Sequence, residues 1–236
     1  MLKPVLSSVI NYVLPYRCAS CSELTKEQDG VCAECFQKLN FITSPYCKIC
    51  GFPFEFVIEE QFSCGKCIAM PPKYDLARSL FKFDQQSKNL IYAFKYNDQT
   101  NHAKMFAKLL LARYKQDIGD IDIIVPVPMY HLKRLIRNYN PAQILAKEIS
   151  RFLGKIILPN LLIKTKWTKP QTSLSKSERL RNLAGSIIVN DRFCIKGKNI
   201  LLVDDVKTTG TTGNNCSMML KKAGAKNITL VTIGMA

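Results

Sequence analysis

Apolar and polar residues in the C-terminal two thirds of the chain follow a pattern that predicts strands separated by helices. Apolar runs rich in isoleucine and valine at residues 121–127, 199–203 and 227–233 have the length and composition of buried strands. Residues 141–153 instead place apolar side chains at helical spacing. Helices between buried strands are typical of a mostly parallel, open α/β sheet, which binds ligands beyond the carboxyl ends of its strands.

Local signals mark the ends of two predicted helices. Asn140 is a good N-cap, Pro141 suits the first helical position, and Gly154 ends the same helix. A second helix is expected from about Thr212 to Ala223, between the last two strands. Both helices therefore connect neighbouring strands of the predicted sheet.

The first residues show a weaker pattern. Valines at positions 5, 9 and 13 recur at helical spacing, so we expect a short amphipathic helix over residues 1–14. A signal peptide would need a longer uninterrupted apolar stretch, and no run approaches the ~20 apolar residues of a membrane span. The sequence therefore predicts a cytoplasmic protein without a membrane span.

Composition changes sharply near residue 70. Residues 1–75 contain 7 Lys/Arg and 8 Asp/Glu, whereas residues 76–236 contain 27 and 10, a net of +17. Eight of the 10 cysteines precede residue 68. Two shifts at the same place predict two domains, residues 1–72 and 73–236, with the boundary near Met70 and Pro72.

The eight N-terminal cysteines form four Cys-x-x-Cys pairs: Cys18/Cys21, Cys32/Cys35, Cys47/Cys50 and Cys64/Cys67. Two such pairs make a closed tetrahedral zinc site, so we predict two structural zinc ions in a small Cys₄ zinc-ribbon domain. Disulfides and redox or iron–sulfur chemistry are the alternatives, but structural disulfides are rare in the cytosol.

The spacing of the pairs favours sequential pairing. Ten residues separate the first two pairs and thirteen separate the last two, and each interval suits a hairpin-like ribbon. An interleaved pairing is the alternative. Gly51 and Gly65 suit the tight turns in which backbone amides approach sulfur.

A basic loop follows the first predicted strand of the C-terminal part. Residues 125–128 read Val-Pro-Val-Pro, and prolines at alternate positions remove amide donors from the same side of a strand. That side should be unpaired, at an edge or an opening loop. Arg134 and Arg137 come soon after, and such a loop suits a polyanion such as pyrophosphate. A solvated helix face is the alternative interpretation.

The most informative stretch is residues 200–212. Its apolar run ends in Asp204 and Asp205, and a loop of threonines with Gly210 then leads into a helix. Amides at a helix start and threonine hydroxyls bind phosphate. Carboxylates beside them need partners such as ribose hydroxyls or Mg²⁺. A phosphorylated ribose meets both requirements, whereas the Walker and Gly-x-Gly-x-x-Gly motifs are absent.

This stretch resembles the 5-phosphoribosyl 1-diphosphate (PRPP) motif of type I phosphoribosyltransferases. The resemblance implies that Asp204 and Asp205 contact the ribose as catalytic residues, with Mg²⁺ bound together with PRPP. It implies a 5′-phosphate site made by five loop residues: Thr208, Thr209, Gly210, Thr211 and Thr212. Lys207 stands where many members carry an apolar residue, and we expect it to add charge near the phosphate.

Nearly the whole chain resembles the ComF family, which joins a double zinc ribbon to a phosphoribosyltransferase-like domain. Residues 94–98 are similar to the family's Lys-Tyr-Gly-Asp segment. Residues 122–128, together with Arg134 and Arg137, are similar to its Val-Pro-Val-Pro loop. Residues 171–182 are similar to its Gln-x-x-Leu…Arg-x-x-Asn stretch. Residues 137–142 depart from the family, because Asn138 and Pro141 replace a glycine and a glutamine. The resemblance implies an accessory role in uptake of single-stranded DNA during natural transformation, other uptake proteins as partners, and a place at the cytosolic face of the inner membrane.

Single-stranded DNA is also a partner that the charge favours. Residues 131–181 carry 12 Lys/Arg against 2 Asp/Glu. A basic groove with stacking aromatics holds single strands, and the candidates are Tyr139, Lys164, Lys166 and Trp167. The same charge also suits PRPP, or a solvated face. An active Mg²⁺-dependent phosphoribosyltransferase of unknown acceptor and a non-catalytic PRPP-sensing regulator are the alternative functions.

Overall fold

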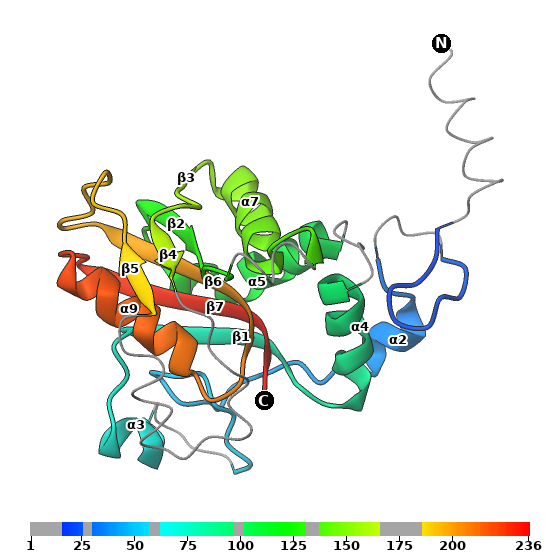
Figure 1. Cartoon of the computed structure of the whole chain (residues 1–236). Helices are drawn as coiled ribbons and strands as arrows, with labels where there is room; N and C mark the ends of the chain where they lie inside the picture. The colour runs from blue at the N-terminus through cyan, green and yellow to red at the C-terminus, as the bar shows by residue number, and fades with distance from the viewer. Residues whose placement is uncertain (1–15, 26–29, 57–61, 97–101, 131–136, 166–185) are drawn as a thin grey trace, which may run out of the picture.

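The computed structural model describes residues 16–25, 30–56, 62–96, 102–130, 137–165 and 186–236 (Figure 1). The helices are α2 (Ala33–Gln37), α3 (Gly65–Ala69), α4 (Gln85–Tyr96), α5 (His102–Ile118), α7 (Pro141–Leu153) and α9 (Thr211–Lys222). The strands are β1 (Leu76–Lys82), β2 (Ile123–Pro126), β3 (Ile156–Ile157), β4 (Leu162–Lys164), β5 (Ile187–Val189), β6 (Asn199–Lys207) and β7 (Asn227–Met235).

Five strands form one open sheet in the order β1-β7-β6-β2-β3, and every pair in it is parallel. Strands β4 and β5 form a separate antiparallel pair, which the sequence pattern did not predict. The predicted fold class is confirmed: an open parallel α/β sheet follows a segment that contains the cysteine pairs. Within the described residues, none of the helices combines the length and the apolar character that crossing a bilayer requires.

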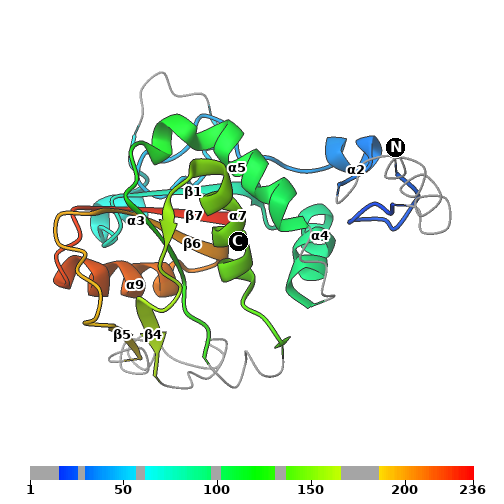
Figure 2. The same cartoon turned by 90° about the horizontal axis from the view of Figure 1, so that it is seen from above.

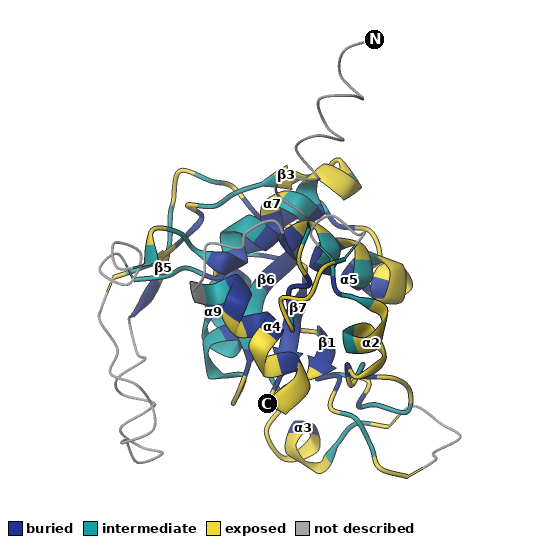
Figure 3. Cartoon of the chain, turned by 90° about the vertical axis from the view of Figure 1, so that its right-hand side faces the viewer, coloured by how far each residue is buried: buried dark blue, intermediate teal, exposed yellow. Residues whose placement is uncertain are grey.

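The two faces of the sheet are covered by different elements (Figure 2). Helices α4, α5 and α7 lie on one face, where Phe94, Leu110 and Leu145 are fully buried. On the other face lie α9 and the β4–β5 pair, together with Cys47 and Cys67 from the N-terminal segment. Strand β7 is mostly dark blue in Figure 3 because all of its residues except the first are buried, whereas β6 is buried over residues 200–203 and half-buried over residues 204–206. The helix expected over residues 1–14 lies outside the described residues.

Helix α7 has the boundaries that the sequence predicted. The Asn140 side chain accepts a hydrogen bond from the Ala142 amide at 3.1 Å, and Pro141 is the first helical residue. Gly154 ends the helix in the left-handed conformation, at φ 64°. Phe152, in the last turn of α7, is 43% exposed, although its spacing from Leu145 and Ile149 predicts that it lies on the apolar face of the helix.

Pro126 and Pro128 lack amide hydrogens, and they lie where no neighbouring strand needs an amide donor from them. The Val127 amide donates to the Val203 carbonyl of β6 at 2.8 Å. Pro126 and Pro128 face the opposite side, towards β3, which pairs with β2 only at Ile123 and Ile124. Strand β2 therefore lies inside the sheet, and the prolines follow the point where its neighbour ends.

Strand β1 forms one edge of the sheet, and the cysteine-rich segment runs along it. The Ile42 amide donates to the Leu80 carbonyl at 2.8 Å, and the Lys82 amide donates to the Asn40 carbonyl at 3.0 Å. Further along, the Ala77 amide donates to a carbonyl of the segment at 2.7 Å. The edge strand thus has backbone partners on both sides. The division of the chain between residues 72 and 73 stays a prediction.

Candidate functional site

Sequential cysteine pairs form two Cys₄ clusters, so the interleaved alternative is excluded. The first Cys₄ site consists of Cys18, Cys21, Cys32 and Cys35, and the second of Cys47, Cys50, Cys64 and Cys67. Within each site the four Sγ atoms lie within 4.8 Å of one another. The Cys21–Cys32 and Cys50–Cys64 sulfur distances are 3.8 and 3.7 Å. Four sulfurs placed tetrahedrally about 2.3 Å from zinc would be about 3.8 Å apart, so both sites fit zinc with no open position.

Backbone amides favour the metal-binding form of the first cysteine in each site. The Cys18 Sγ accepts from the Cys32 amide at 3.3 Å, and the Cys47 Sγ accepts from the Cys64 amide at 3.2 Å. Burial opposes ionisation of these thiols, but the amide hydrogen bonds outweigh it. They lower the pKa of Cys18 to about 6 and the pKa of Cys47 to about 7. The thiolate is the form that binds metal.

The residue after the first cysteine pair of each site has a left-handed backbone. Ser22 has φ 65° and Gly51 has φ 70°. A Cβ on Gly51 would lie 2.6 Å from the Ala77 carbonyl oxygen, so only glycine fits there. This confirms the prediction for Gly51. Gly65 is different, because it begins α3 and has open space around it, so this position does not require glycine.

Asp204 and Asp205 lie near the carboxyl end of β6, where an open parallel sheet binds its ligands. Both carboxylates are half-buried and accept hydrogen bonds from the backbone. Asp204 accepts from the Asp205 amide at 2.9 Å, and Asp205 accepts from the Val206 amide at 2.6 Å. Burial, together with the Asp205 carboxylate, raises the pKa of Asp204 to about 8. The cause is that the Asp204 carboxylate would lose hydration and lie beside a second negative charge.

Lys95 forms an ion pair with one carboxylate of the acidic pair, and the sequence analysis did not predict this contact. Its Nζ lies 3.2 Å from the Asp205 carboxylate, and both side chains are less than 20% exposed. Lys95 is in the last turn of α4, whose start follows β1 closely in the chain. The available signal was the similarity of residues 94–98 to a family segment, which pointed to this position without showing its partner.

Residues 208–212, here called the threonine loop, connect β6 to α9. Gly210 is the N-cap of α9 and has φ 76°, a conformation that favours glycine. The Thr209 and Thr211 hydroxyl oxygens are 2.6 Å apart, and the Asn214 amide donates to the Gly210 carbonyl at 2.9 Å. Amides in the first turn of a helix have no partner within the helix, so they are available to an anion.

Lys207 does not add charge to the threonine loop, contrary to expectation. Its side chain is 8% exposed, and its Nζ donates to the Cys50 carbonyl at 2.6 Å. The ammonium group therefore lies beside the second Cys₄ site. The expectation was wrong because sequence proximity to the loop does not fix the direction of a long side chain.

The predicted basic and aromatic residues are only partly placed. Three of them lie outside the described residues: Arg134, Lys166 and Trp167. Arg137 is half-buried. The Tyr139 hydroxyl donates to the Phe94 carbonyl at 2.8 Å, so this ring is attached to α4. Asn138 has a left-handed backbone, with φ 62°. Glycine and asparagine tolerate this conformation better than other residues, so asparagine can replace the glycine of the family segment here.

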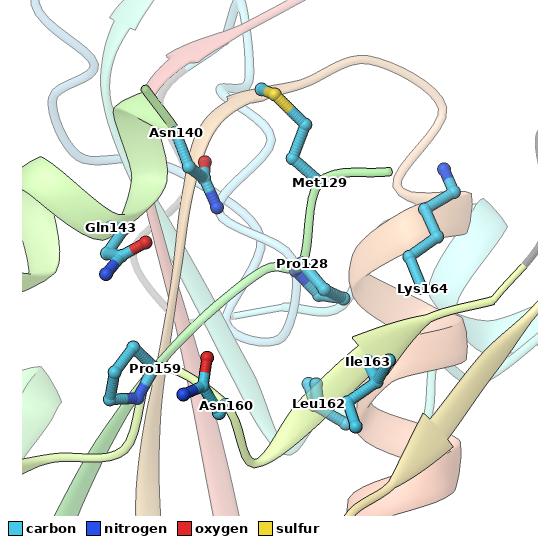
Figure 4. Close-up of a pocket in the computed structure, with 9 residues that line it drawn as sticks. All are labelled: Pro128, Met129, Asn140, Gln143, Pro159, Asn160, Leu162, Ile163 and Lys164. Carbon is cyan, nitrogen blue, oxygen red and sulfur yellow. The ribbon is translucent and has the colours of Figure 1, made fainter. Parts of the chain in front are cut away.

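A cavity of about 240 Å³ lies beside the carboxyl end of β2 (Figure 4). Pro128 and Met129 come from the end of β2, Asn140 and Gln143 from the start of α7, and Lys164 from the end of β4. Amide and ammonium groups thus face the cavity among apolar walls, a lining that suits a ligand with both polar and apolar parts.

The cavity lies close to the acidic pair. Burial and the Asp204 carboxylate raise the pKa of the Cys216 thiol, whereas Lys164 lowers it. Lys164 and Asp204 therefore act on the same buried thiol of α9. Because β2 and β6 are neighbours in the sheet, with Pro126 opposite Val203, the cavity and the acidic pair lie beside the carboxyl ends of adjacent strands.

Comparison with known proteins gives matches over both parts of the chain. The description "Double zinc ribbon domain" matches residues 9–68. Competence protein F from Haemophilus influenzae is 31% identical over 221 residues, which cover 90% of this chain and 94% of that protein. DNA utilization protein YhgH from Escherichia coli is 26% identical, covering 83% and 86%. Competence protein ComFC from Bacillus subtilis is 25% identical, covering 89% and 86%.

Solved structures that are similar to this chain include an enzyme that acts on PRPP. The glutamine PRPP amidotransferase from Bacillus subtilis, complexed with ADP and GMP, is 18% identical with a TM-score of 0.42. The match covers 60% of this chain and 30% of that chain.

Proposed function

This chain belongs to the ComF family of competence proteins, and we propose that it binds PRPP or a related phosphoribosyl ligand with Mg²⁺ while assisting the handling of single-stranded DNA in natural transformation. One observation carries the ligand part of this proposal. A half-buried carboxylate pair and a threonine loop lie at the carboxyl end of the central strand β6.

The acidic pair and the loop have complementary chemistry. The ribose hydroxyls of the ligand would donate to Asp204 and Asp205, and Mg²⁺ would bind where carboxylate and phosphate oxygens meet. The 5′-phosphate would accept from the amides at the start of α9 and from the threonine hydroxyls. Lys95 would exchange its contact with Asp205 for a contact with the ligand. Arg134 and Arg137 would hold the pyrophosphate.

The DNA part of the proposal rests on charge and on the relatives. Residues 76–236 carry a net charge of +17, which exceeds what a small anionic ligand needs. Relatives that match most of the chain are named competence protein F and DNA utilization protein. A basic surface beside the phosphoribosyl site would bind the backbone of single-stranded DNA through the residues predicted from the sequence.

Calorimetric titration with PRPP and Mg²⁺, and separately with a short single-stranded oligonucleotide, tests both parts. The double variant Asp204→Asn/Asp205→Asn should stay folded and lose PRPP binding, whereas the exposed carboxylate variant Asp191→Asn should bind normally. Retained PRPP affinity in the folded double variant would contradict the ligand assignment. Because this titration contains no acceptor, binding without release of pyrophosphate fits both a transferase and a sensor. Release of pyrophosphate that occurs only after an acceptor base is added would identify a transferase.

The pH dependence of PRPP binding gives a second test of the acidic pair. The proton on Asp204 competes with Mg²⁺ and with ribose hydroxyls, and its pKa is raised to about 8. Affinity should therefore rise about tenfold between pH 7 and pH 9, as the carboxyl group becomes ionised. In Asp204→Asn this dependence should disappear. A wild-type affinity that is flat over this range would show that the ligand does not need the ionised pair.

Salt dependence separates DNA binding from PRPP binding. Each neutralised phosphate of a single strand contributes a slope of about −0.7 in log affinity against log salt. Replacing Arg134, Arg137, Lys164 and Lys166 together should flatten that slope. Trp167→Ala should weaken binding by ~1–3 kcal/mol if the ring stacks on a base, with little change in slope. Full competition between PRPP and the oligonucleotide would show that both bind at one site.

A further inference from the structure

The second Cys₄ site is attached directly to the sheet through three consecutive backbone carbonyls. The Lys48 carbonyl accepts from the Arg78 guanidinium at 3.3 Å, and the Ile49 carbonyl accepts from the Ala77 amide at 2.7 Å. The Cys50 carbonyl accepts from the Lys207 ammonium at 2.6 Å. The first two donors belong to β1 and the third ends β6, so the turn that carries two zinc ligands contacts two strands of the sheet.

Lys207 is the last residue before the threonine loop. Its side chain is 8% exposed, and the chain leaves the sheet at this point to form residues 208–212. An ammonium group buried this deeply needs a partner that offsets its lost hydration. A zinc ion bound by four thiolates carries a net negative charge, so the second Cys₄ site supplies both a carbonyl acceptor and a favourable field for Lys207.

The other half of the second site contacts the threonine loop itself. Lys66, between the ligands Cys64 and Cys67, donates through its Nζ to the Thr209 carbonyl at 3.5 Å. The Lys73 amide donates to the Asn214 side chain in α9 at 2.6 Å. The hydroxyl of buried Tyr74 lies 3.8 Å from the position that a Cβ on Gly210 would take. These contacts therefore reach Lys207 before the loop, Thr209 within it and Asn214 after it.

We infer that the second Cys₄ zinc site positions the threonine loop, with Lys207 as the positioning residue, so that zinc at this site and a phosphoribosyl ligand at the loop bind cooperatively. The first Cys₄ site has no such part in the loop's geometry, because in the described part of the chain its contacts are with α4 and the opposite face of the sheet. The ligand side of this inference rests on the proposed function, whereas the effect of zinc on the loop does not.

Hydrogen exchange of the amides of residues 214–217 tests the support of the loop without any ligand, because the Asn214 amide donates to the Gly210 carbonyl of the loop and the following amides depend on the same turn of α9. The full-length zinc-loaded protein is compared with Lys207→Met, which keeps the volume and removes the donor, and with Lys207→Arg, which keeps a donor. Loss of a hydrogen bond from a charged group is expected to speed exchange about tenfold or more in Lys207→Met, with partial rescue in Lys207→Arg. Unchanged exchange in a folded Lys207→Met protein would overturn the inference.

Cysteine variants separate the two zinc sites. Cys67→Ser, which opens the second site, should speed exchange of the same α9 amides, and Cys21→Ser, which opens the first site, should leave them protected. If Lys207→Met does not fold, this pair and Lys66→Met, at an exposed position, carry the test. Equal exchange of these amides in the two cysteine variants would show that the loop does not depend on the second site.

The mutual effect of zinc and PRPP on each other's affinity gives a second measurement, which a lysine with only a structural role would not change. If zinc and ligand are coupled, PRPP with Mg²⁺ must raise the affinity of one of the two zinc ions, measured by competition with a chelator, by the factor with which zinc raises PRPP affinity. We expect a factor of about ten, lost in Lys207→Met. Two unaffected zinc ions in a protein that binds PRPP would overturn the cooperativity. A wild-type protein that does not bind PRPP would refute the proposed function, while the exchange experiment would still decide the support of the loop.

Discussion

The two zinc sites share a cysteine spacing but differ in what they hold together. In the first, Cys18 is buried and Cys21 is exposed, and the site lies beside α4 at one end of the molecule (Figure 1). In the second, three of four ligands are buried and belong to the same apolar core as α9 and β6. A repeated motif therefore does not imply a repeated role. One site packs with α4 against one core of the sheet, and the other belongs to the core on the opposite face, beside the candidate ligand site.

The two regions are also attached to the sheet by different kinds of contact. The region that follows the first site contacts β1 through the Phe41 and Phe81 rings, whose centroids are 4.8 Å apart, and through backbone hydrogen bonds of Asn40 and Ile42. The region of the second is held by buried Arg78, which pairs with Asp117 at 2.8 Å and lies 4.7 Å from the Tyr46 ring centre. Both regions thus have backbone hydrogen bonds with β1, and the second adds a buried, hydrogen-bonded ion pair that fixes its geometry further.

The largest expected effect is the difference in thermal stability between a protein that has lost the second zinc and one that has lost the first. Zinc contributes ~10–16 kcal/mol to folding of isolated zinc fingers. Cys67→Ser should remove one zinc and lower the main thermal unfolding transition strongly, because its site shares the core of the sheet. Cys21→Ser should also remove one zinc but leave the main transition within a few degrees, through local unfolding. Metal analysis and calorimetry of the full-length variants check both, and equal losses of Tm would remove the distinction.

Two arginines give a matched test of the attachments. Arg78 is 3% exposed and donates to Asp117 and to the Lys48 carbonyl, whereas exposed Arg17 donates to the Ser22 carbonyl at 2.9 Å. Arg78→Met should cost about 3 kcal/mol of the free energy of unfolding, because a buried ion pair is broken. Arg17→Met should cost less than about 1 kcal/mol. Denaturant titration measures both. Similar costs would show that the second region is no more tightly attached than the first.

The smallest effect concerns the left-handed residue that follows the first cysteine pair of each site. Gly51→Ser should destabilise by about 1–3 kcal/mol, since it adds a Cβ at a left-handed position 2.6 Å from a carbonyl oxygen. Ser22→Gly should instead stabilise the first site by about 0.5–1 kcal/mol, because it relieves the same backbone conformation. Resistance of each zinc to a chelator is the measurement. A destabilising Ser22→Gly would mean that the serine side chain has a contact that outweighs its backbone cost.

Features that depend on neighbouring residues in the chain could be predicted from the sequence. The pairing of cysteines, the ends of α7 and the loop after Asp204 and Asp205 all follow from local spacing, and the structure agrees with the first two. The relation of the loop to the carboxyl end of β6 follows from the rules of parallel sheets. These parts need no knowledge of which distant segments meet.

Features that depend on distant segments were missed or mistaken. Lys95 reaches Asp205 only because α4 ends beside β6, and Lys207 turns to Cys50, which is 157 positions away in the chain. The antiparallel β4–β5 pair joins short strands whose apolar residues are too few to show a period. Roles that the sequence assigned to Arg134, Lys166 and Trp167 stay predictions.

The backbone bonds along β1 have a consequence for how the protein can be divided. An open edge strand offers unpaired amides and carbonyls to any other strand, and such edges promote self-association. Here Asn40 and Ile42 occupy part of that edge. A fragment that begins at residue 73 would expose it, together with apolar β1 side chains such as Leu80 and Phe81. The cysteine-rich segment therefore covers part of an aggregation-prone edge, and we expect attempts to express the sheet alone to give aggregates that the full chain does not form.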